Sequence, residues 1–328
     1  MRAFYILAGW LLAWQLAFCQ SAADDGSGAV RISGPLLGYL LDPAEASLRP
    51  VWGVPGAATL GAPVALSVRW ARAAVAPTHD YLLAQVEGEP DLALLSLEAA
   101  PAAPQRIPGA LENPDRMVFS PAGTAAVLHR SSDGTIQVLA GLPREPVLAG
   151  RFTIPGDAGA LTALAVSDDA RAVLAALAGG ETALFTAEGR SRRVGLPGAA
   201  SALAFFRGSH DAVIASRAER TVYLLRDAGG ADEITALARE GDGVDDPVAV
   251  ETSWDGRRVL VANAASLLVV DLAGGVLWPI PSPSRITGLH RLAGNAVFRL
   301  EEPGAGPLAV LDADASEPRV VFVPAVAR

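Results

Sequence analysis

Apolar residues in this chain occur in short runs, and turn-forming residues separate the runs. The clearest succession has four runs, at residues 248–252, 258–263, 267–271 and 276–280. Runs of this length, rich in Val, Leu and Ile and bounded by Gly, Asp, Ser or Pro, predict β-strands. The turn Ser253-Trp254-Asp255-Gly256 suits a tight hairpin, because glycine tolerates a positive φ. We therefore expect four short strands in about 40 residues.

The same pattern repeats along the chain, and a hydrophobic-Pro-Gly mark separates the copies. The mark occurs at Val54-Pro55-Gly56, Ile107-Pro108-Gly109, Ile154-Pro155-Gly156 and Leu196-Pro197-Gly198, with weaker forms at Ile280-Pro281-Ser282 and Val323-Pro324-Ala325. One mark is missing near Arg239. A period of about 40–50 residues predicts stacked copies of one supersecondary unit.

Six complete units begin near residues 64, 113, 160, 201, 244 and 284. Before them, residues 36–42 and 49–54 match only the last two strands of a unit, and Val30-Arg31-Ile32 is a candidate third strand. Four-stranded units of this size are typical of β-propeller blades. We predict an all-β protein, a β-propeller of seven four-stranded blades with a partial first blade; six or eight blades remain alternatives.

The predicted organisation is a segment 1–23 followed by a single propeller domain, 24–328. Its units lie near 30–63, 64–112, 113–159, 160–200, 201–243, 244–283 and 284–325. A helical alternative exists at 160–178, which is rich in alanine, the best helix former. Ser167-Asp168-Asp169 interrupts this run where other copies have their turn, so strands are favoured.

The N-terminus has the features of an export signal. Arg2 precedes an apolar run from Phe4 to Phe18, and Ser21-Ala22-Ala23 supplies small residues for cleavage. The run is shorter than the roughly 20 residues of a membrane span. The single cysteine, Cys19, lies here, but bulky Phe18 precedes it, which disfavours lipid anchoring. We expect an exported protein, periplasmic or extracellular, whose mature chain has no cysteine and no stable membrane span.

The amino-acid composition and the absence of known motifs exclude several classes of partner and activity. The formal net charge is −9, and all 26 basic residues are Arg. No basic footprint for nucleic acid is present. The sequence also lacks the phosphate-binding, zinc-protease and serine-hydrolase motifs.

The segment Ser253-Trp254-Asp255-Gly256, the run 258–263 and Asp271 after it resemble the bacterial exported YVTN-type β-propeller repeat, which is WD-like in size. The family turn is Ser-Pro-Asp-Gly, so Trp254 replaces its proline, whereas Ser120-Pro121 keeps it. The resemblance implies the propeller fold. Because propellers host binding modules, scaffolds and unrelated enzymes, it implies no reaction.

Two sets of residues are candidates for chemistry. His79-Asp80 and His210-Asp211 are near copies, 131 residues apart. We interpret both as residues of the turn between first and second strands rather than as one acid–base site. The acidic loop 240–246 offers the oxygen ligands that Ca²⁺ prefers, but it lacks EF-hand spacing, and we interpret it as a solvated loop.

We predict a non-enzymatic binding or scaffold module, monomeric, that binds an unknown protein or surface ligand and needs no cofactor. The family analogy places binding on the face that carries the loops between units and between second and third strands. Glu301 and Glu302 lie in one such loop, and the candidate binding residues are Asp133, Arg217, Arg220, Asp242, Asp245 and Asp246. The alternative is a Ca²⁺-dependent enzyme of the lactonase or hydrolase type with a metal in the central channel.

Overall fold

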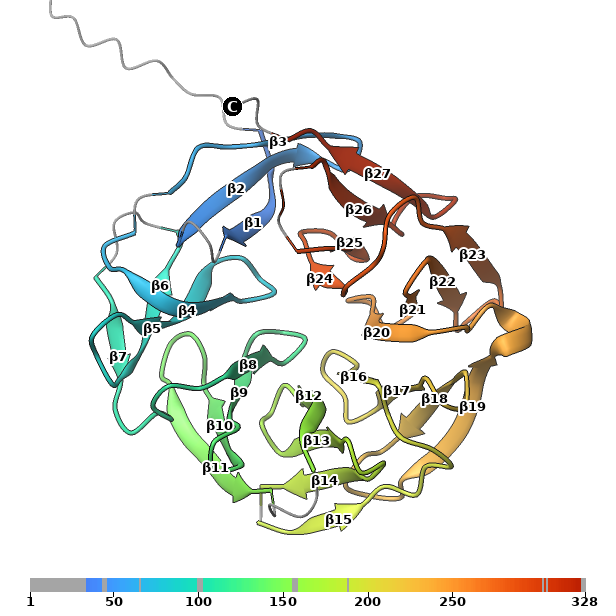
Figure 1. Ribbon diagram of the computed structural model, residues 1–328, viewed down its shortest axis with the longest axis horizontal. Coiled ribbons are helices and arrows are strands. Elements are labelled where there is room, and N and C mark those ends of the chain that lie inside the picture. The colour runs from blue at the N-terminus through green and yellow to red at the C-terminus, as the bar shows by residue number, and fades with distance from the viewer. Residues whose placement is uncertain are drawn as a thin grey trace, which may run out of the picture. The chain divides into compact units, whose positions relative to one another are not determined.

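Seven small antiparallel sheets surround a common axis (Figure 1). The computed structural model describes residues 34–42, 46–64, 66–98, 103–154, 159–187, 189–302, 304 and 306–325. Within these ranges, six of the sheets have four strands and the first has three, each formed from strands consecutive in the chain. The predicted all-β class and the seven-bladed propeller are confirmed. The predicted signal segment 1–23, with Cys19, and Val30-Arg31-Ile32 lie outside the described residues.

The strands are numbered in chain order. The first three blades comprise β1 (Leu36–Asp42), β2 (Ser47–Val54) and β3 (Ala57–Leu60); β4 (Trp70–Val75), β5 (Tyr81–Val86), β6 (Leu92–Ser96) and β7 (Gln105–Ile107); and β8 (Arg116–Phe119), β9 (Ala125–Arg130), β10 (Thr135–Ala140) and β11 (Val147–Thr153). Blades 4 and 5 comprise β12 (Leu161–Val166), β13 (Ala172–Leu177), β14 (Thr182–Thr186) and β15 (Ser191–Arg193); and β16 (Ala202–Phe205), β17 (Ala212–Ser216), β18 (Thr221–Arg226) and β19 (Glu233–Arg239). Blades 6 and 7 comprise β20 (Pro247–Thr252), β21 (Arg258–Asn263), β22 (Ser266–Asp271) and β23 (Leu277–Pro281); and β24 (His290–Arg291), β25 (Val297–Arg299), β26 (Leu308–Asp312) and β27 (Arg319–Val323).

The position of a strand in its blade explains its composition. Each blade is covered on both faces by its neighbours, so the middle strands are buried on both sides and are continuously apolar. All six residues of β13 are buried, whereas all three residues of the outermost strand β15 are exposed. The helical alternative for 160–178 is wrong, because these residues form β12, a turn and β13.

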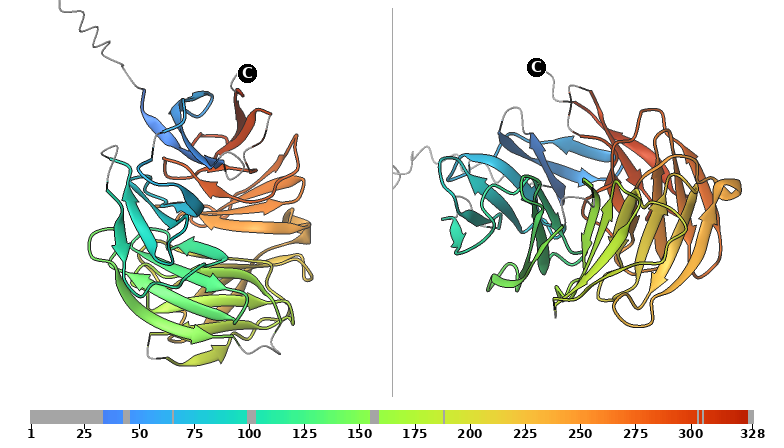
Figure 2. Two further views of the ribbon diagram at one scale, coloured as in Figure 1. Left: turned by 60° about the vertical axis from the view of Figure 1, so that its left-hand side comes forward. Right: turned by 60° about the horizontal axis from the view of Figure 1, so that its bottom comes forward.

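The core is divided among the interfaces between blades. Seven separate clusters of buried apolar residues are present in the described part of the chain, one for each pair of neighbouring blades. Between blades 4 and 5, for example, Ala172 and Ala176 pack with Leu174, Phe205 and Ile214. Stability therefore depends on each blade having both neighbours. Figure 2 shows these sheets side by side around the axis.

Two ends of the propeller are defined by its connections. The turn face carries the segments between first and second strands, at 76–80, 120–124, 167–171, 206–211, 253–257 and 292–296. The loop face carries the segments between second and third strands and between blades. The one 3₁₀ helix among the described residues, η2 (Glu240–Asp242), lies on the loop face, where the repeat lacks its Pro-Gly mark.

The three strands of blade 1 correspond to the second, third and fourth strands of the other blades. The Leu37 carbonyl at the start of β1 accepts a hydrogen bond (2.7 Å) from the N–H of Ala293, in a turn-face segment. Strand β1 therefore starts at the turn face, as second strands do, and β3 lies beside the outermost strand β27. Among the described residues, no strand precedes β1 on the inner side of blade 1 (Figure 1).

This arrangement corrects the prediction for the partial first unit. The sequence pattern matched 36–42 and 49–54 to the last two strands, but β3 follows them as an additional outer strand. The Val54-Pro55-Gly56 mark, which elsewhere follows the outermost strand, here forms the turn between β2 and β3. The mark is local turn chemistry, so it does not identify a strand's place in the blade.

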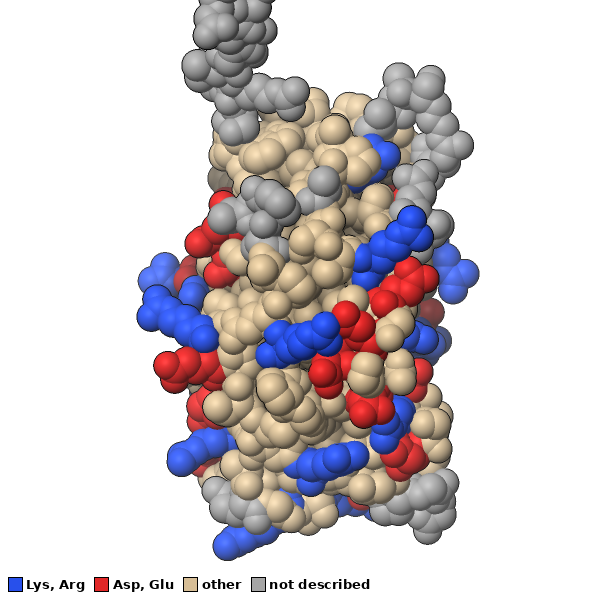
Figure 3. Space-filling view, turned by 90° about the vertical axis from the view of Figure 1, so that its left-hand side faces the viewer, with Lys and Arg blue, Asp and Glu red and all other residues tan. Residues whose placement is uncertain are grey.

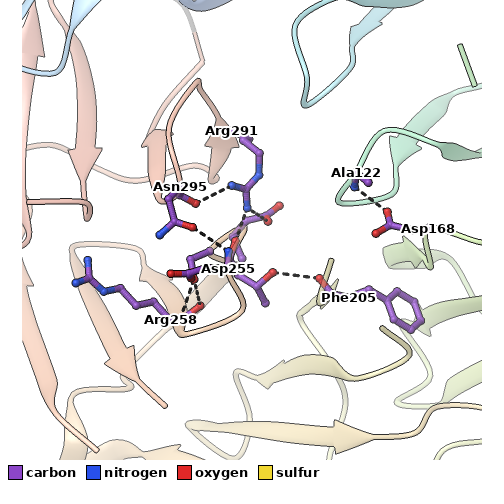
Figure 4. Close-up of polar contacts among 10 residues, drawn as sticks. Ala122, Asp168, Phe205, Asp255, Arg258, Arg291 and Asn295 are labelled. Carbon is purple, nitrogen blue, oxygen red and sulfur yellow. Dashed lines mark hydrogen bonds and ion pairs between the residues drawn. The ribbon is translucent and has the colours of Figure 1, made fainter. Parts of the chain in front are cut away.

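Turn-face segments also connect neighbouring blades. The two carboxylate oxygens of Asp168 in blade 4 accept hydrogen bonds from the N–H groups of Ala122 (2.7 Å) in blade 3 and Gly208 (2.6 Å) in blade 5. Figure 4 shows the first of these contacts. In the part of the chain that is described, no helix is both long and apolar enough to cross a membrane.

Candidate functional site

A cavity of about 530 Å³ lies at the centre of the ring, lined by residues from all seven blades. We call it the channel site. Its wall is formed by the innermost strands β4, β8, β12, β16, β20 and β24 and, at blade 1, by Tyr39 and Leu41 of the second-strand equivalent β1. The cavity volume falls within the range of ligand pockets, about 300–1,000 Å³. The channel site is thus large enough to hold a ligand.

The lining of the channel site is chemically uneven. Blades 1 to 5 contribute mostly apolar side chains, including Val75, Phe119, Val166 and Leu203. Blades 6 and 7 contribute a charged group, which consists of Glu251, His290, Arg291, Arg299 and Glu302. An apolar wall faced by a few convergent polar groups is the usual composition of a binding pocket.

Arg291 and Glu251 form one ion pair of the charged group. They project from the inner strands of blades 7 and 6, with Arg291 Nη2 3.4 Å from Glu251 Oε2. The Arg291 side chain is 6% exposed and donates hydrogen bonds to the carbonyls of Thr252 and Asn295 (Figure 4). It also lies over the Phe298 ring. These contacts fix its position and leave it little freedom to meet a ligand.

Burial opposes charge on both partners of this pair. It raises the pKa of the Glu251 carboxyl, and the neighbouring Arg291 charge counteracts that rise. Burial also lowers the pKa of the Arg291 guanidinium, which the Glu251 charge counteracts. Each charge therefore depends on the other. The pair joins two blades and supports the channel wall.

His290, Arg299 and Glu302 form the second ionic group, at the loop face. His290 and Arg299 lie opposite each other on β24 and β25. Glu302 Oε1 lies 3.1 Å from His290 Nε2, and its Oε2 accepts a hydrogen bond (3.3 Å) from Arg299 Nη1. The hydrogen bond from His290 and the positive charges of His290 and Arg299 lower the pKa of the Glu302 carboxyl to about 2. The surroundings of Glu302 therefore strongly favour the ionised form of its carboxyl group.

His79 lines the same cavity from the turn face. It is 8% exposed, and neither of its ring nitrogens has a hydrogen-bond partner among the described residues. Burial lowers the pKa of its imidazole to about 4 and the Arg291 charge acts in the same direction, whereas an interaction with the Arg291 backbone and the Asp80 charge oppose the shift. His79 is therefore neutral at physiological pH. A buried polar group without a partner is uncommon and is a candidate ligand contact.

The two histidines that the sequence singled out lie where the interpretation placed them, in the turns between first and second strands. Their surroundings differ. His79 is buried beside the channel, whereas His210 in blade 5 is partly exposed and its Nε2 lies 3.0 Å from Asp169 Oδ2 of blade 4. They do not share a site.

The candidate binding residues of the loop face all contact other residues of the protein. Arg217 contacts Asp246, and Arg220 contacts Glu240. These contacts bring the loop after β17 next to the segment between blades 5 and 6. Asp133 lies apart, in blade 3, where its Oδ2 is 2.7 Å from Arg130 Nη2; that hydrogen bond lowers the pKa of the Asp133 carboxyl.

The remaining candidates stabilise the acidic loop itself. Asp242 accepts a hydrogen bond (2.9 Å) from the Arg239 N–H, and the Asp245 N–H donates one (3.1 Å) to the Asn263 side chain. Within the described ranges, no group of three or more His, Cys, Asp or Glu side chains is placed to hold a metal ion. On the side shown in Figure 3, acidic and basic residues are interspersed, without a large patch of one sign.

The sequence analysis missed most of the channel site. It named Glu302 as a loop-face residue but neither Glu251, Arg291 nor Arg299. A signal was present: Glu251 and Arg299 each interrupt an otherwise apolar strand. Charged residues are rarely buried unless they are paired, so charges within predicted inner strands indicate a paired or functional site.

The fold defines the class: this chain is a seven-bladed β-propeller. No family model and no curated protein matches the sequence. The fold is similar to the crystal structure of a functionally unknown protein from Desulfotomaculum acetoxidans DSM 771, with a TM-score of 0.57 and 13% identity over 89% of this chain and 100% of that chain.

Two further neighbours are the structure of U3-55K and the crystal structure of the RRP9 WD40 repeats. The first has a TM-score of 0.54 and 12% identity, covering 77% of this chain and 80% of that chain. The second has a TM-score of 0.54 and 13% identity, covering 78% and 80%. At these identities the likeness shows the fold alone, a propeller with WD40-repeat neighbours.

Proposed function

We propose that this protein is a non-enzymatic binding module that takes a short peptide segment of a partner protein into the channel site. The observation that carries the proposal is a cavity that blades 1 to 5 line with mostly apolar side chains and blades 6 and 7 line with a charged group, of which His290, Arg299 and Glu302 lie at the loop face. Binding requires such a polar group to orient a ligand and apolar surface to hold it.

A peptide suits this cavity better than a purely apolar molecule. Innermost strands have a sheet partner on one side only, so backbone N–H and C=O groups on their other edge face the channel. An unpaired strand edge offers hydrogen bonds to an extended peptide. At blade 1, which lacks a described inner strand, Tyr39 and Leu41 of β1 line the cavity instead.

We further propose that the module acts after export, as a periplasmic or extracellular protein. The apolar run from Phe4 to Phe18 and the small residues Ser21-Ala22-Ala23 support this, as does the YVTN-like segment around Ser253 and Asp255. Mass determination of the protein recovered from cell fractions tests it. We expect a mature form that begins near Asp24 in an exported fraction; a full-length form retained in the cytoplasm would contradict the proposal.

Site-selective blocking tests the channel as the binding site. The only native cysteine is Cys19, so in a chain beginning at Asp24 one introduced cysteine can be labelled alone. Ala74 lines the channel and is half-buried; Arg217 is exposed on the loop face. We expect a bulky maleimide on Ala74→Cys to abolish retention of a synthetic short-peptide library, read by mass spectrometry.

The same label on Arg217→Cys is the matched control and leaves retention unchanged. The reverse result, with loss only for labelled Arg217→Cys, would place binding on the loop face and overturn the channel proposal. Equal retention by both labelled proteins would also contradict it. Thermal melting of each labelled protein confirms that the fold is intact.

A further inference from the structure

Arg299 is a buried cation whose counter-charge is exposed. The residue is 8% exposed, and its guanidinium, which carries five N–H donors, makes its one hydrogen bond to a described residue with Glu302. The Glu302 side chain itself is 64% exposed. The adjacent Glu301 carboxylate is directed to the Ala309 N–H, at 3.3 Å. Most of the donor capacity of Arg299 is therefore not used by Glu301 or Glu302.

Glu302, the exposed member of this ion pair, is the one that can move away from Arg299. Glu302 can turn into solvent because most of its side chain is already exposed, but its departure leaves the Arg299 charge buried without a partner. A buried guanidinium without any counter-charge is much less favourable. The departure of Glu302 is therefore coupled to the arrival of another anion. The replacing group must be an anion that accepts two hydrogen bonds, as the Glu302 carboxylate does from His290 and Arg299.

We propose that Glu302 occupies the place of a ligand carboxylate, and that the ligand is the C-terminal end of a peptide with apolar side chains. Its terminal carboxylate takes the contacts to Arg299 and His290, and its last residues lie along the inner strand edges against the apolar wall of blades 1 to 5. The inference rests on the proposed function of the channel site and specifies its ligand. Arg299 is a binding residue in this scheme, and Glu302 is an internal competitor.

The cavity limits how much of the peptide is recognised. A volume of about 530 Å³ holds a few residues, so only the end of a chain, counted from its terminal carboxylate, fits within the channel site. Recognition of a chain end by its carboxylate is an established way of reading peptides. The apolar wall then selects the side chains of the last residues.

Calorimetric titration of the chain beginning at Asp24 tests the proposal. The probes are an acetylated tripeptide of alanine, valine and leucine as the free acid and the same tripeptide as its C-terminal amide. We expect the acid to bind at least tenfold more tightly, because charge-assisted hydrogen bonds to Arg299 are lost with the amide. Equal affinity of acid and amide would overturn the carboxylate contact while leaving the channel proposal standing.

Substitution at Glu302 should raise the affinity for the acid, whereas loss of Arg299 should lower it. Glu302→Gln removes the internal competitor, so it should tighten binding of the acid by up to about fivefold and leave the amide unchanged. The matched control Glu240→Gln removes the exposed carboxylate that contacts Arg220 and should change neither. Weaker binding of the acid to Glu302→Gln would overturn the proposal.

Arg299→Met should lower the affinity for the acid about tenfold or more, to that of the amide. If this variant does not fold, the acid–amide comparison and the Glu302→Gln variant still test whether a ligand carboxylate binds here. Dodecanoate tests whether the carboxylate belongs to a fatty acid rather than to a peptide. Tight binding of dodecanoate without any binding of the tripeptide acid would overturn the proposal of a peptide ligand. If no probe binds and labelling Ala74→Cys has no effect on library retention, the proposed function fails as well.

Discussion

Asp168 in blade 4 accepts a hydrogen bond from the backbone N–H of Gly208 in blade 5. Its second oxygen accepts one from Ala122 in blade 3, so one side chain connects three consecutive blades. The contact lies on the turn face, at the end of the channel opposite Glu302. Since each blade is stabilised by its neighbours, a connection of this kind fixes the relative positions of the walls that line the channel.

Replacement of this carboxylate should destabilise the protein. Asp168→Ala leaves the Ala122 and Gly208 N–H groups without their partner, and we expect the free energy of unfolding to fall by about 2 kcal/mol. Asp133→Ala is the matched control, since Asp133 pairs with Arg130 within one hairpin, and should cost less than about 1 kcal/mol. Urea denaturation measures both; equal losses would show that the connection between blades adds nothing.

The seam between the first and last blades is sensitive to added volume at Gly38. A Cβ there would lie 2.7 Å from Leu292 Cδ2 and 3.1 Å from His79 Cε1, and the backbone has a φ of +155°. Leu292 is 1% exposed and has little space to move. We expect Gly38→Ala to cost about 1–3 kcal/mol, as overpacked cores do.

Gly195→Ala is the control for Gly38, because a Cβ at Gly195 meets nothing within 4 Å. Thermal melting compares the two variants. An unchanged melting temperature for Gly38→Ala would mean that blades 1 and 7 are less tightly packed than the structure shows.

Acid should weaken the fold through His79. Its folded-state pKa of about 4 lies below the ordinary histidine value of 6.5, so the unfolded chain binds a proton that the folded protein does not. Stability is therefore complete above pH 6.5 and falls as the pH drops toward 4, by about 3 kcal/mol for a shift of this size.

His79→Gly should remove this part of the pH dependence, and glycine accepts the positive φ of 61° at this position. The control His210→Gly, in the corresponding turn of blade 5, should keep it. Denaturation at a series of pH values from 7 to 4 measures, for both variants, how steeply the free energy of unfolding changes with pH. A His79→Gly slope as steep as that of the native protein would contradict the assignment.

Chelation should leave the melting temperature unchanged. The carboxylates that line the channel, Glu251 and Glu302, are bound by Arg291, Arg299 and His290, and coordination of Ca²⁺ would require these ion pairs to break. Melting with and without a chelator, together with elemental analysis, is the measurement. Equimolar Ca²⁺ and a large chelator-induced loss of stability would support the alternative of a metal-dependent enzyme.

The sequence predicts this fold well where strand and turn signals coincide. The runs at 248–252 and 258–263 correspond within a residue to β20 and β21, because strands buried on both faces are continuously apolar and easy to recognise. The short strand β3 was missed: its four residues alternate in exposure and follow a Pro-Gly turn that elsewhere ends a blade.

The channel site could not be assembled from the sequence in the same way. Arg299 and Glu302 are close in the chain, but their meaning depends on the burial of one and the exposure of the other, and Glu251 meets Arg291 across 40 residues. Polar positions in loops, such as Arg217 and Asp246, are more conspicuous. They proved to bind one another.

Among the described residues, blades 1 and 7 share no sheet, and this has a consequence for how the molecule opens. Hydrophobic contacts and the Ala293–Leu37 hydrogen bond join the first and last blades, so separating them breaks no strand pairing. Every other pair of neighbouring blades is also joined by the chain itself, so transient opening should begin between blades 1 and 7, and amide exchange should be fastest along that boundary. For the same reason, the protein should tolerate circular permutation, with old ends linked and new ends cut between two other blades.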